Sequence, residues 1–98
     1  MIIVSQDKET IINFENTTRI SIIPPVEKGH KYSIAINGCL DLGYYKTKER
    51  AKEIIAEITL AYSNFTYFKT ATKEGKDYII NLLKHKYEKF DIYEMPKE

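Results

Sequence analysis

The dipeptide Asn37-Gly38 constrains the fold more than any other feature of the chain, because it separates two runs of β-forming residues. A two-residue type I′ turn needs positive φ at both central positions, and Asn-Gly is the favoured pair for it. Apolar residues at every second position share one face of the expected hairpin: Tyr32, Ile34 and Ile36 before the turn, and Leu40, Leu42 and Tyr44 after it. The sequence therefore predicts an antiparallel hairpin over residues 32–45.

Three shorter β-rich runs precede this hairpin, at residues 2–5, 10–14 and 19–23. The polar turn QDKE, at residues 6–9, separates the first two runs. The Pro-Pro pair at residues 24–25 ends the third run, because proline cannot donate to a β-ladder. Five strands in sequential order with short connections favour one antiparallel meander.

An amphipathic helix is expected next, in the stretch LGYYKTKERAKEIIAEI at residues 42–58. Thr47 is the expected N-cap, since its hydroxyl can accept a backbone N–H of the first turn. Apolar residues then recur at spacings of three and four, which is one stripe of a helix: Ala51, Ile54, Ile55, Ile58, Tyr62 and Phe65. We expect this helix to lie across the sheet and close the core.

The β-branched and aromatic residues at positions 65–70 favour a break after Asn64, and they leave open whether this segment is helix, strand or loop. Thr72 is expected to cap a second helix over residues 73–90, whose apolar positions again form a stripe. Residues 92–95 are the candidate for a short last strand.

The fold class expected for residues 1–98 is therefore a single α+β domain: a five-stranded antiparallel β-meander followed by two α-helices, with a candidate short C-terminal strand. A chain of this length buries less than about two-thirds of its unfolded surface. An oligomer interface would add burial, and we expect a homo-oligomer.

Composition narrows the class of protein. Fifteen basic against 14 acidic residues give a net charge of +1, which does not favour strong nonspecific nucleic-acid binding. Cys39 is the single cysteine, so an internal disulfide is excluded and a reducing compartment fits. We find no basic leader and no run of 18 apolar residues, so we expect no membrane association and a place in the cytoplasm.

The residues with catalytic potential do not form a known motif. The chain has no HExxH, GxSxG, GxGxxG or GxxxxGK[ST] pattern, and His30 and His85 are not at metal-ligand spacing. Cys39 could act as a nucleophile with His30 if the fold joined them, but a small inert thiol is the more common role. We therefore expect no enzyme, no cofactor and no metal site.

Aromatic residues are unusually frequent, with eight Tyr, four Phe and no Trp. Rings beside basic residues suit a purine and its phosphate, but they also suit a homodimer interface or a small core. By chemistry, arginine would meet phosphates and aromatic rings would stack on a base. The candidate ligand-binding residues are Arg19, Tyr45, Arg50, Phe65 and Tyr67.

Three segments carry a resemblance to known proteins: SQDK at residues 5–8, LGYYKTKERAKEII at residues 42–55, and IYEMP at residues 92–96. Together they resemble small proteins of Firmicutes and their prophages. The layout is also similar to the type-one Thoeris anti-defence proteins of phages, which have an N-terminal antiparallel sheet followed by helices and which oligomerise. Members of that family sequester cyclic ADP-ribose-type signals, made by TIR-domain defence enzymes, without cleaving them.

The resemblance implies a noncatalytic counter-defence protein of a phage or prophage that binds and sequesters a cyclic nucleotide or a cyclic ADP-ribose-type immune signal. The alternative is a protein-binding inhibitor of a host defence complex, similar in action to an anti-CRISPR protein. A third hypothesis is an enzyme that acts on a nucleotide. It would be supported if Cys39 or His30 lay in a cleft with a partner at hydrogen-bond distance.

Overall fold

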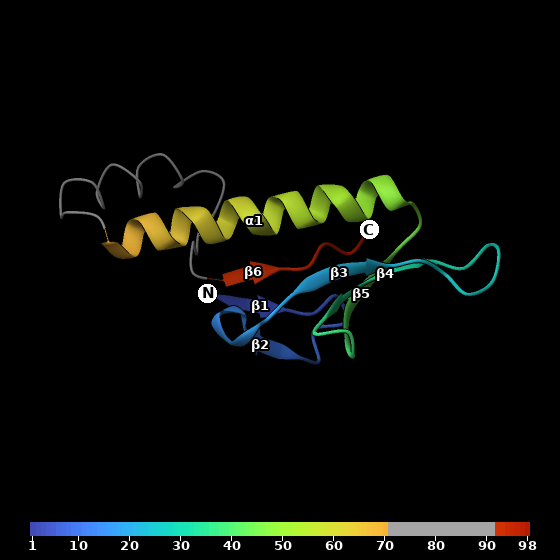
Figure 1. Ribbon diagram of the computed structural model, residues 1–98, viewed down its shortest axis with the longest axis horizontal. Helices are drawn as coiled ribbons and strands as arrows, with labels where there is room; N and C mark the ends of the chain where they lie inside the picture. Colours follow the sequence, from blue (N-terminus) through green and yellow to red (C-terminus); the bar gives the residue numbers. More distant parts are fainter. Residues whose placement is uncertain (71–91) are drawn as a thin grey trace.

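The structure is a computed structural model, and it describes residues 1–70 and 92–98. The described chain contains two three-stranded sheets, a short 3₁₀ helix and one long α-helix (Figure 1). The elements are β1 (Ile2–Val4), β2 (Ile11–Asn13), η1 (Phe14–Asn16), β3 (Ile20–Ile23), β4 (Tyr32–Ile36), β5 (Leu40–Tyr45), α1 (Lys48–Thr70) and β6 (Ile92–Glu94). In this described part, no helix has both the length and the apolar character that a membrane span requires.

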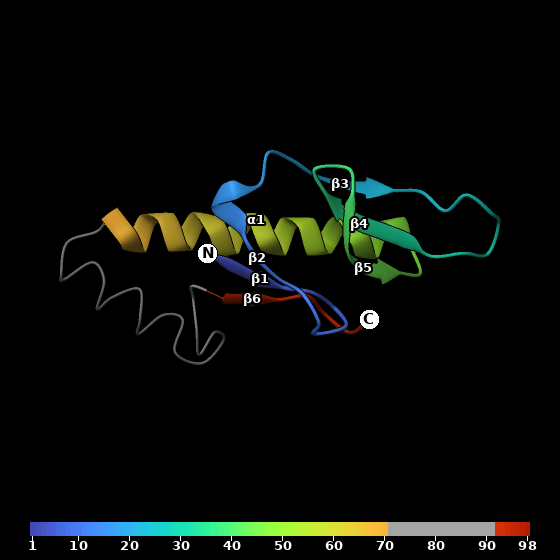
Figure 2. The same ribbon diagram turned by 90° about the horizontal axis from the view of Figure 1, so that it is seen from below.

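The α+β class and the C-terminal strand are confirmed, but the single five-stranded meander is wrong. Sheet A has the order β2-β1-β6 and sheet B has the order β3-β4-β5. In sheet A, β1 pairs antiparallel with β2 and parallel with β6, so the first and last strands lie side by side (Figures 1 and 2). The meander breaks after β2 because Asn13 caps η1, its side chain accepting the Glu15 N–H at 3.1 Å, and the chain leaves the extended conformation there.

The hairpin β4–β5 forms at the predicted turn. Asn37 and Gly38 both have positive φ, at 52° and 74°, and Ile36 pairs with Leu40 across them. The Asn37 side chain also accepts the backbone N–H groups of Thr18 and Arg19, at 2.9 and 3.2 Å, which fixes the segment leading into β3. The turn therefore organises all three strands of sheet B.

A β-bulge in β5 changes which side chains face the core. Ala35 pairs with Asp41 and Ile34 pairs with Gly43, so Leu42 is an extra residue in β5. An extra residue reverses the alternation of faces for the rest of the strand. Leu42 is buried.

The consequence of the bulge is clearest at the adjacent tyrosines. The expected grouping of Tyr44 with Leu42 on the core face is wrong, because Tyr44 is 49% exposed while Tyr45 is only 1% exposed. Tyr45 therefore occupies the core position that strict alternation assigns to Tyr44.

Helix α1 covers one side of both sheets (Figure 1). Its stripe buries Ala51, Ile54 and Ile58, as expected. The predicted break after Asn64 is wrong, since α1 continues to Thr70. The stripe explains this, because half-buried Phe65 extends it and packs against the core. The second helix, predicted over residues 73–90, lies outside the described residues.

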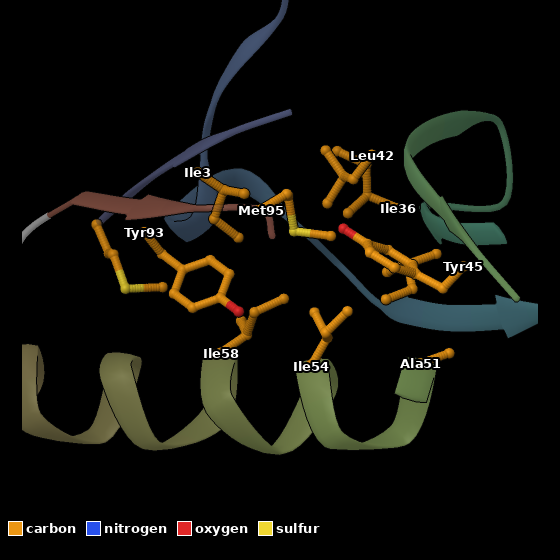
Figure 3. Packing of buried hydrophobic residues seen from close by; sticks show 11 residues of the cluster. Ile3, Ile36, Leu42, Tyr45, Ala51, Ile54, Ile58, Tyr93 and Met95 are labelled. Atoms are coloured by element: carbon orange, nitrogen blue, oxygen red, sulfur yellow. The ribbon is translucent and has the colours of Figure 1, made fainter. Parts of the chain in front are cut away.

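A single hydrophobic core joins the two sheets to α1 (Figure 3). Its largest fully buried side chains come from both sheets, from α1 and from the residue after β6: Ile3, Ile34, Leu42, Tyr45, Ile54, Ile58 and Met95. In Figure 3, Tyr93 and Met95 project from β6 and the following residue between sheet A and the helix. The two sheets therefore share one core.

Candidate functional site

Three segments far apart in the sequence, residues 5–8, 42–55 and 92–97, meet at one place, and Gln6 joins them. The Gln6 backbone N–H donates to the Leu42 carbonyl at 2.8 Å. Its side-chain Nε2 donates to the carbonyls of Tyr44 and Lys97, at 3.1 and 2.7 Å, while Oε1 accepts the Tyr44 N–H at 2.8 Å. The amide of Gln6 thus acts as an additional peptide group between β5 and the chain end. We call this contact region the seam.

The SQDK segment forms the turn that presents Gln6 to the seam. The Ser5 hydroxyl donates to Asp7 Oδ1 at 2.5 Å, and the Glu9 N–H donates to the same oxygen at 2.9 Å. Ser5 Oγ also accepts the Thr10 N–H at 3.0 Å. The two hydrogen bonds to Asp7 lower the pKa of its carboxyl below the ordinary value. The bond from Ser5 makes the larger contribution, and the bond from Glu9 N–H the smaller one.

The chain end is fastened by three consecutive carbonyls, those of residues 96–98. They accept from Tyr45 Oη at 2.7 Å, from Gln6 Nε2 at 2.7 Å and from Arg50 Nε at 3.0 Å, in that order. The donors come from β5, from the β1–β2 turn and from α1. The seam is therefore a structural junction between the β1–β2 turn, β5, α1 and the chain end.

Two buried tyrosines lie beside the seam and are poor acids or bases. Burial raises the pKa of Tyr45 to about 12. Burial also raises the pKa of Tyr93, whose hydroxyl donates to Glu57 Oε2 at 2.8 Å. Both hydroxyls therefore stay protonated near neutral pH and serve as hydrogen-bond donors.

A hollow of about 230 Å³ opens next to the seam, at the start of α1. Four of its lining residues are cationic and one is acidic. We call this hollow the basic hollow. Its lining comprises Lys31, Tyr44, Tyr45, Lys46, Thr47, Arg50, Lys97 and Glu98. Nothing in the composition of a chain with net charge +1 shows this local excess of positive charge.

The first turn of α1 adds to the positive potential of the basic hollow. Thr47 is the N-cap, as predicted: its hydroxyl accepts the Arg50 N–H at 3.1 Å, and its carbonyl accepts the Ala51 N–H at 3.2 Å. A helix N-terminus carries a partial positive charge that favours anions. An anion in the basic hollow would therefore contact the lysine side chains and also the N-terminus of a 23-residue helix.

The arginine in the hollow is mostly engaged within the protein. Arg50 Nη1 lies 3.1 Å from Glu53 Oε2 and 3.9 Å from Glu57 Oε1, and Nε donates to the carbonyl of Glu98. The lysines that line the hollow are exposed. The charge offered to a ligand therefore comes mainly from lysine, with Arg50 as a partly neutralised contributor.

The five predicted ligand-binding residues do not converge. Tyr45 and Arg50 both line the basic hollow, but the Tyr45 ring is buried and its face is covered. Phe65 lies fifteen residues further along α1, about 22 Å away at 1.5 Å per residue, and Tyr67 lies beyond it. Arg19 lies at the other end of sheet B, with its guanidinium against Gly38. One small ligand cannot contact all five.

Sequence reasoning missed the lysines of the basic hollow. Lys46 immediately precedes the helix cap, a position that could have been noticed. Lys31 and Lys97 carry no local signal, because only the fold brings residues from the β3–β4 loop and the chain end to the start of α1. Tyr44 was missed because the bulge, which turns it outward, was not anticipated.

Two arrangements considered from the sequence, a metal-binding cluster and a pair of Cys39 with His30, are not formed by the described residues. Within residues 1–70 and 92–98, no three His, Cys, Asp or Glu side chains are placed to hold a metal ion. Cys39 is exposed beside the hairpin turn, whereas His30 lies at the opposite end of β4, where its Nε2 is 3.2 Å from Glu27 Oε2. These two residues therefore do not form a pair.

Comparison of the chain with protein-family models, with curated proteins and with solved structures gives no match.

Proposed function

We propose that the protein is a noncatalytic binding module that takes an anionic, nucleotide-type small molecule in the basic hollow. One observation carries the proposal: four cationic side chains line a hollow at the N-terminus of α1, with a single carboxylate among them. Phosphate groups are bound in this way, by lysine charges together with a helix N-terminus.

An aromatic ring at the rim supports recognition of a base. Tyr44 is half exposed, and its hydroxyl donates to Asp41 Oδ2 at 2.6 Å, a bond that orients the ring and raises the pKa of the phenol. Stacking of a base on an aromatic side chain contributes about 1–3 kcal/mol in known complexes. Tyr44 therefore replaces Tyr45 as the candidate stacking residue.

The lining groups favour binding without a reaction. General acid–base catalysis works best with a pKa near the operating pH. The two tyrosines that line the hollow have pKa values raised above an already high ordinary value, and Glu98 is the one carboxylate in the lining. A ligand held here would be sequestered and recovered intact.

The size of the hollow limits what one copy can enclose. Pockets for drug-sized ligands usually measure about 300–1,000 Å³, and the basic hollow is smaller. A cyclic ADP-ribose-type molecule or a cyclic nucleotide would place one phosphate-bearing part in the hollow and extend over Tyr44. The role we propose is counter-defence by a phage or prophage in the cytoplasm of the bacterial host, in agreement with the resemblance.

Thermal unfolding of the purified protein against cyclic nucleotides and ADP-ribose isomers tests the proposal. A ligand at 100 times its dissociation constant adds about 2.7 kcal/mol, a shift of several degrees for a domain of this size. Lys46→Ala should reduce this shift, and Lys52→Ala, on an exposed position of α1 outside the hollow, should leave it unchanged. Recovery of an altered ligand would overturn binding without reaction, and no shift across the panel would overturn the ligand class.

A second function is favoured by a different surface. The outer face of sheet A exposes apolar side chains, with Ile2 at 39% and Ile11 at 68%. Exposed apolar residues grouped on a sheet face are typical of a protein-binding surface. A protein-binding inhibitor of a host defence complex would use this face. Such an inhibitor would co-purify with a protein target, and small molecules would not shift its melting temperature.

A further inference from the structure

The open edge of sheet B has unpaired backbone groups in a regular pattern. Antiparallel pairs alternate between hydrogen-bonded and non-hydrogen-bonded, and the bond from Asn37 N–H to the Arg19 carbonyl sets the phase. Ser21 and Ile23 are therefore bonded to β4, while the N–H and C=O of Ile20 and Ile22 point away from it. Among the described residues, none donates to or accepts from these four groups, and Figure 2 shows no other strand beyond β3.

The side chains at this edge are apolar and incompletely buried. Ile20 and Ile22 face the core, but both remain partly exposed at the border of the sheet. Ile23 is 37% exposed on the other face. An edge strand of this composition is usually protected by charge, by a bulge or by a covering element. β3 itself contains no charged residue; Arg19 precedes the strand and Pro24 follows it.

The charges beside the edge decide what can cover it. Pairing of β3 with β3 of a second copy, centred on Ser21, sets Ile20 opposite Ile22 of that copy and Arg19 opposite Ile23 of that copy. No like charges face one another. The β2 edge of sheet A is shorter, because β2 has only three residues, Ile11–Asn13, before the chain turns into η1. Of these two edges, β3 is the longer, and it can pair with itself without placing like charges opposite each other.

We propose that β3 pairs antiparallel with β3 of a second copy of this chain, about a two-fold axis at Ser21. All four free groups of Ile20 and Ile22 are then hydrogen-bonded, and a six-stranded sheet runs through the dimer. The isoleucines of the two copies lie side by side and extend each core into the other. The contact is isologous, which is the commonest arrangement of homodimers. It does not depend on a ligand in the basic hollow.

Sedimentation equilibrium of the full chain at several concentrations measures the dimer directly. We expect a mass of twice 11.5 kDa at high concentration. Ser21→Lys places two like charges across the axis, at a Cα separation of about 4.5 Å, and should weaken dimerisation about tenfold. Thr18→Lys, at an exposed position three residues before the axis, should weaken it less than twofold. A wild-type chain that stays monomeric, or equal effects of both lysines, would overturn the proposal.

Cross-linking tests the register. Ser21→Cys in a Cys39→Ser background places two thiols opposite each other within the Cα range of a disulfide, about 4.4–6.8 Å. Thr18→Cys in the same background lies about 20 Å from its symmetry mate in this register. On mild oxidation, the first variant should form covalent dimers at least ten times faster. Equal rates would exclude the axis at Ser21, and matching circular dichroism melts under reductant establish that both variants fold.

Discussion

The two sheets are built in different ways. Sheet B uses consecutive strands between residues 20 and 45, and a tight turn joins β4 to β5. All residues of β4 from Ser33 to Ile36 are buried. Sheet A joins β1 and β2 to β6, which is almost ninety residues away in the chain, and its outer face exposes Ile2 and Ile11. One sheet is made by neighbours in sequence, and the other is completed by a remote strand.

The difference shows why the seam is needed. The fastening of residues 96–98 uses donors from Gln6, Tyr45 and Arg50, and two of these belong to β5 and α1, outside sheet A. Sheet A is therefore held in place by sheet B and the helix. Because both sheets also share one core, we expect them to unfold together.

The largest effect should come from emptying the core under either sheet. Ile3→Ala in sheet A and Ile34→Ala in sheet B each remove a side chain that is fully buried, and each should lower the free energy of unfolding by about 2–5 kcal/mol in a urea titration. Similar costs, with a single transition seen by circular dichroism and by tyrosine fluorescence, are expected from the shared core. A cost below about 1 kcal/mol for Ile3→Ala would mean that sheet A opens by itself.

The next effect should come from the seam. Gln6→Ala removes three side-chain hydrogen bonds and leaves the Tyr44 peptide groups and the Lys97 carbonyl without them, which should cost about 1–3 kcal/mol. Amide hydrogen exchange should rise in β6 and less in β4. Glu9→Ala, in the same turn but outside the seam, serves as the control and should change stability by less than about 0.5 kcal/mol. Equal effects of the two substitutions would contradict a special role of Gln6.

A smaller effect should follow from Tyr45→Phe, which leaves the carbonyl of residue 96 without its donor at a cost of about 1 kcal/mol at neutral pH. The raised pKa also predicts a pH dependence. Tyr45 keeps its proton to about pH 12 when folded, whereas an unfolded tyrosine loses it near pH 10, so the stability contribution is full below about pH 10 and is lost toward pH 12. The phenylalanine variant should show a shallower alkaline decline in its melting temperature. An unchanged decline would show that Tyr45 is not the titrating group.

The smallest effect should come from Asp7→Asn in the SQDK turn. The folded pKa of Asp7 is lowered, so its contribution is present above the unfolded pKa and is lost as the pH falls through the folded value. The variant should therefore lose stability relative to wild type near pH 7 and approach it below about pH 4. Melting curves from pH 2 to 7 measure this, and a difference that stays constant with pH would contradict the linkage.

Local signals in the sequence were sufficient for the hairpin and for the start and stripe of α1. Asn37-Gly38 sets its turn through backbone geometry alone, and Thr47 caps the helix through a contact within one turn. The parallel pairing of β1 with β6 and the extra residue Leu42 were out of reach. The first depends on contacts between residues ninety positions apart, and the second is a local departure from strict alternation that the apolar pattern does not mark.

The candidate site shows the same limit. Arg50 and Tyr45 lie near the start of the helix, and the sequence identified both. The aromatic residues at the other end of α1 were grouped with them by chemistry, although a straight helix holds them about 22 Å apart. Lys97 completes the hollow only because the seam brings the chain end there, so its role follows from the fold.

The most direct measurement is an amide NMR titration of the isotope-labelled protein with inorganic pyrophosphate and with ADP-ribose isomers. If the basic hollow binds anions, the amides of residues 46–50 and 97 should shift progressively and saturate, and Lys46→Ala should weaken the response. The amides of β2, across the molecule on the edge of sheet A, should stay unchanged. Shifts spread evenly over exposed lysines, or none at residues 46–50, would contradict a binding site in the basic hollow.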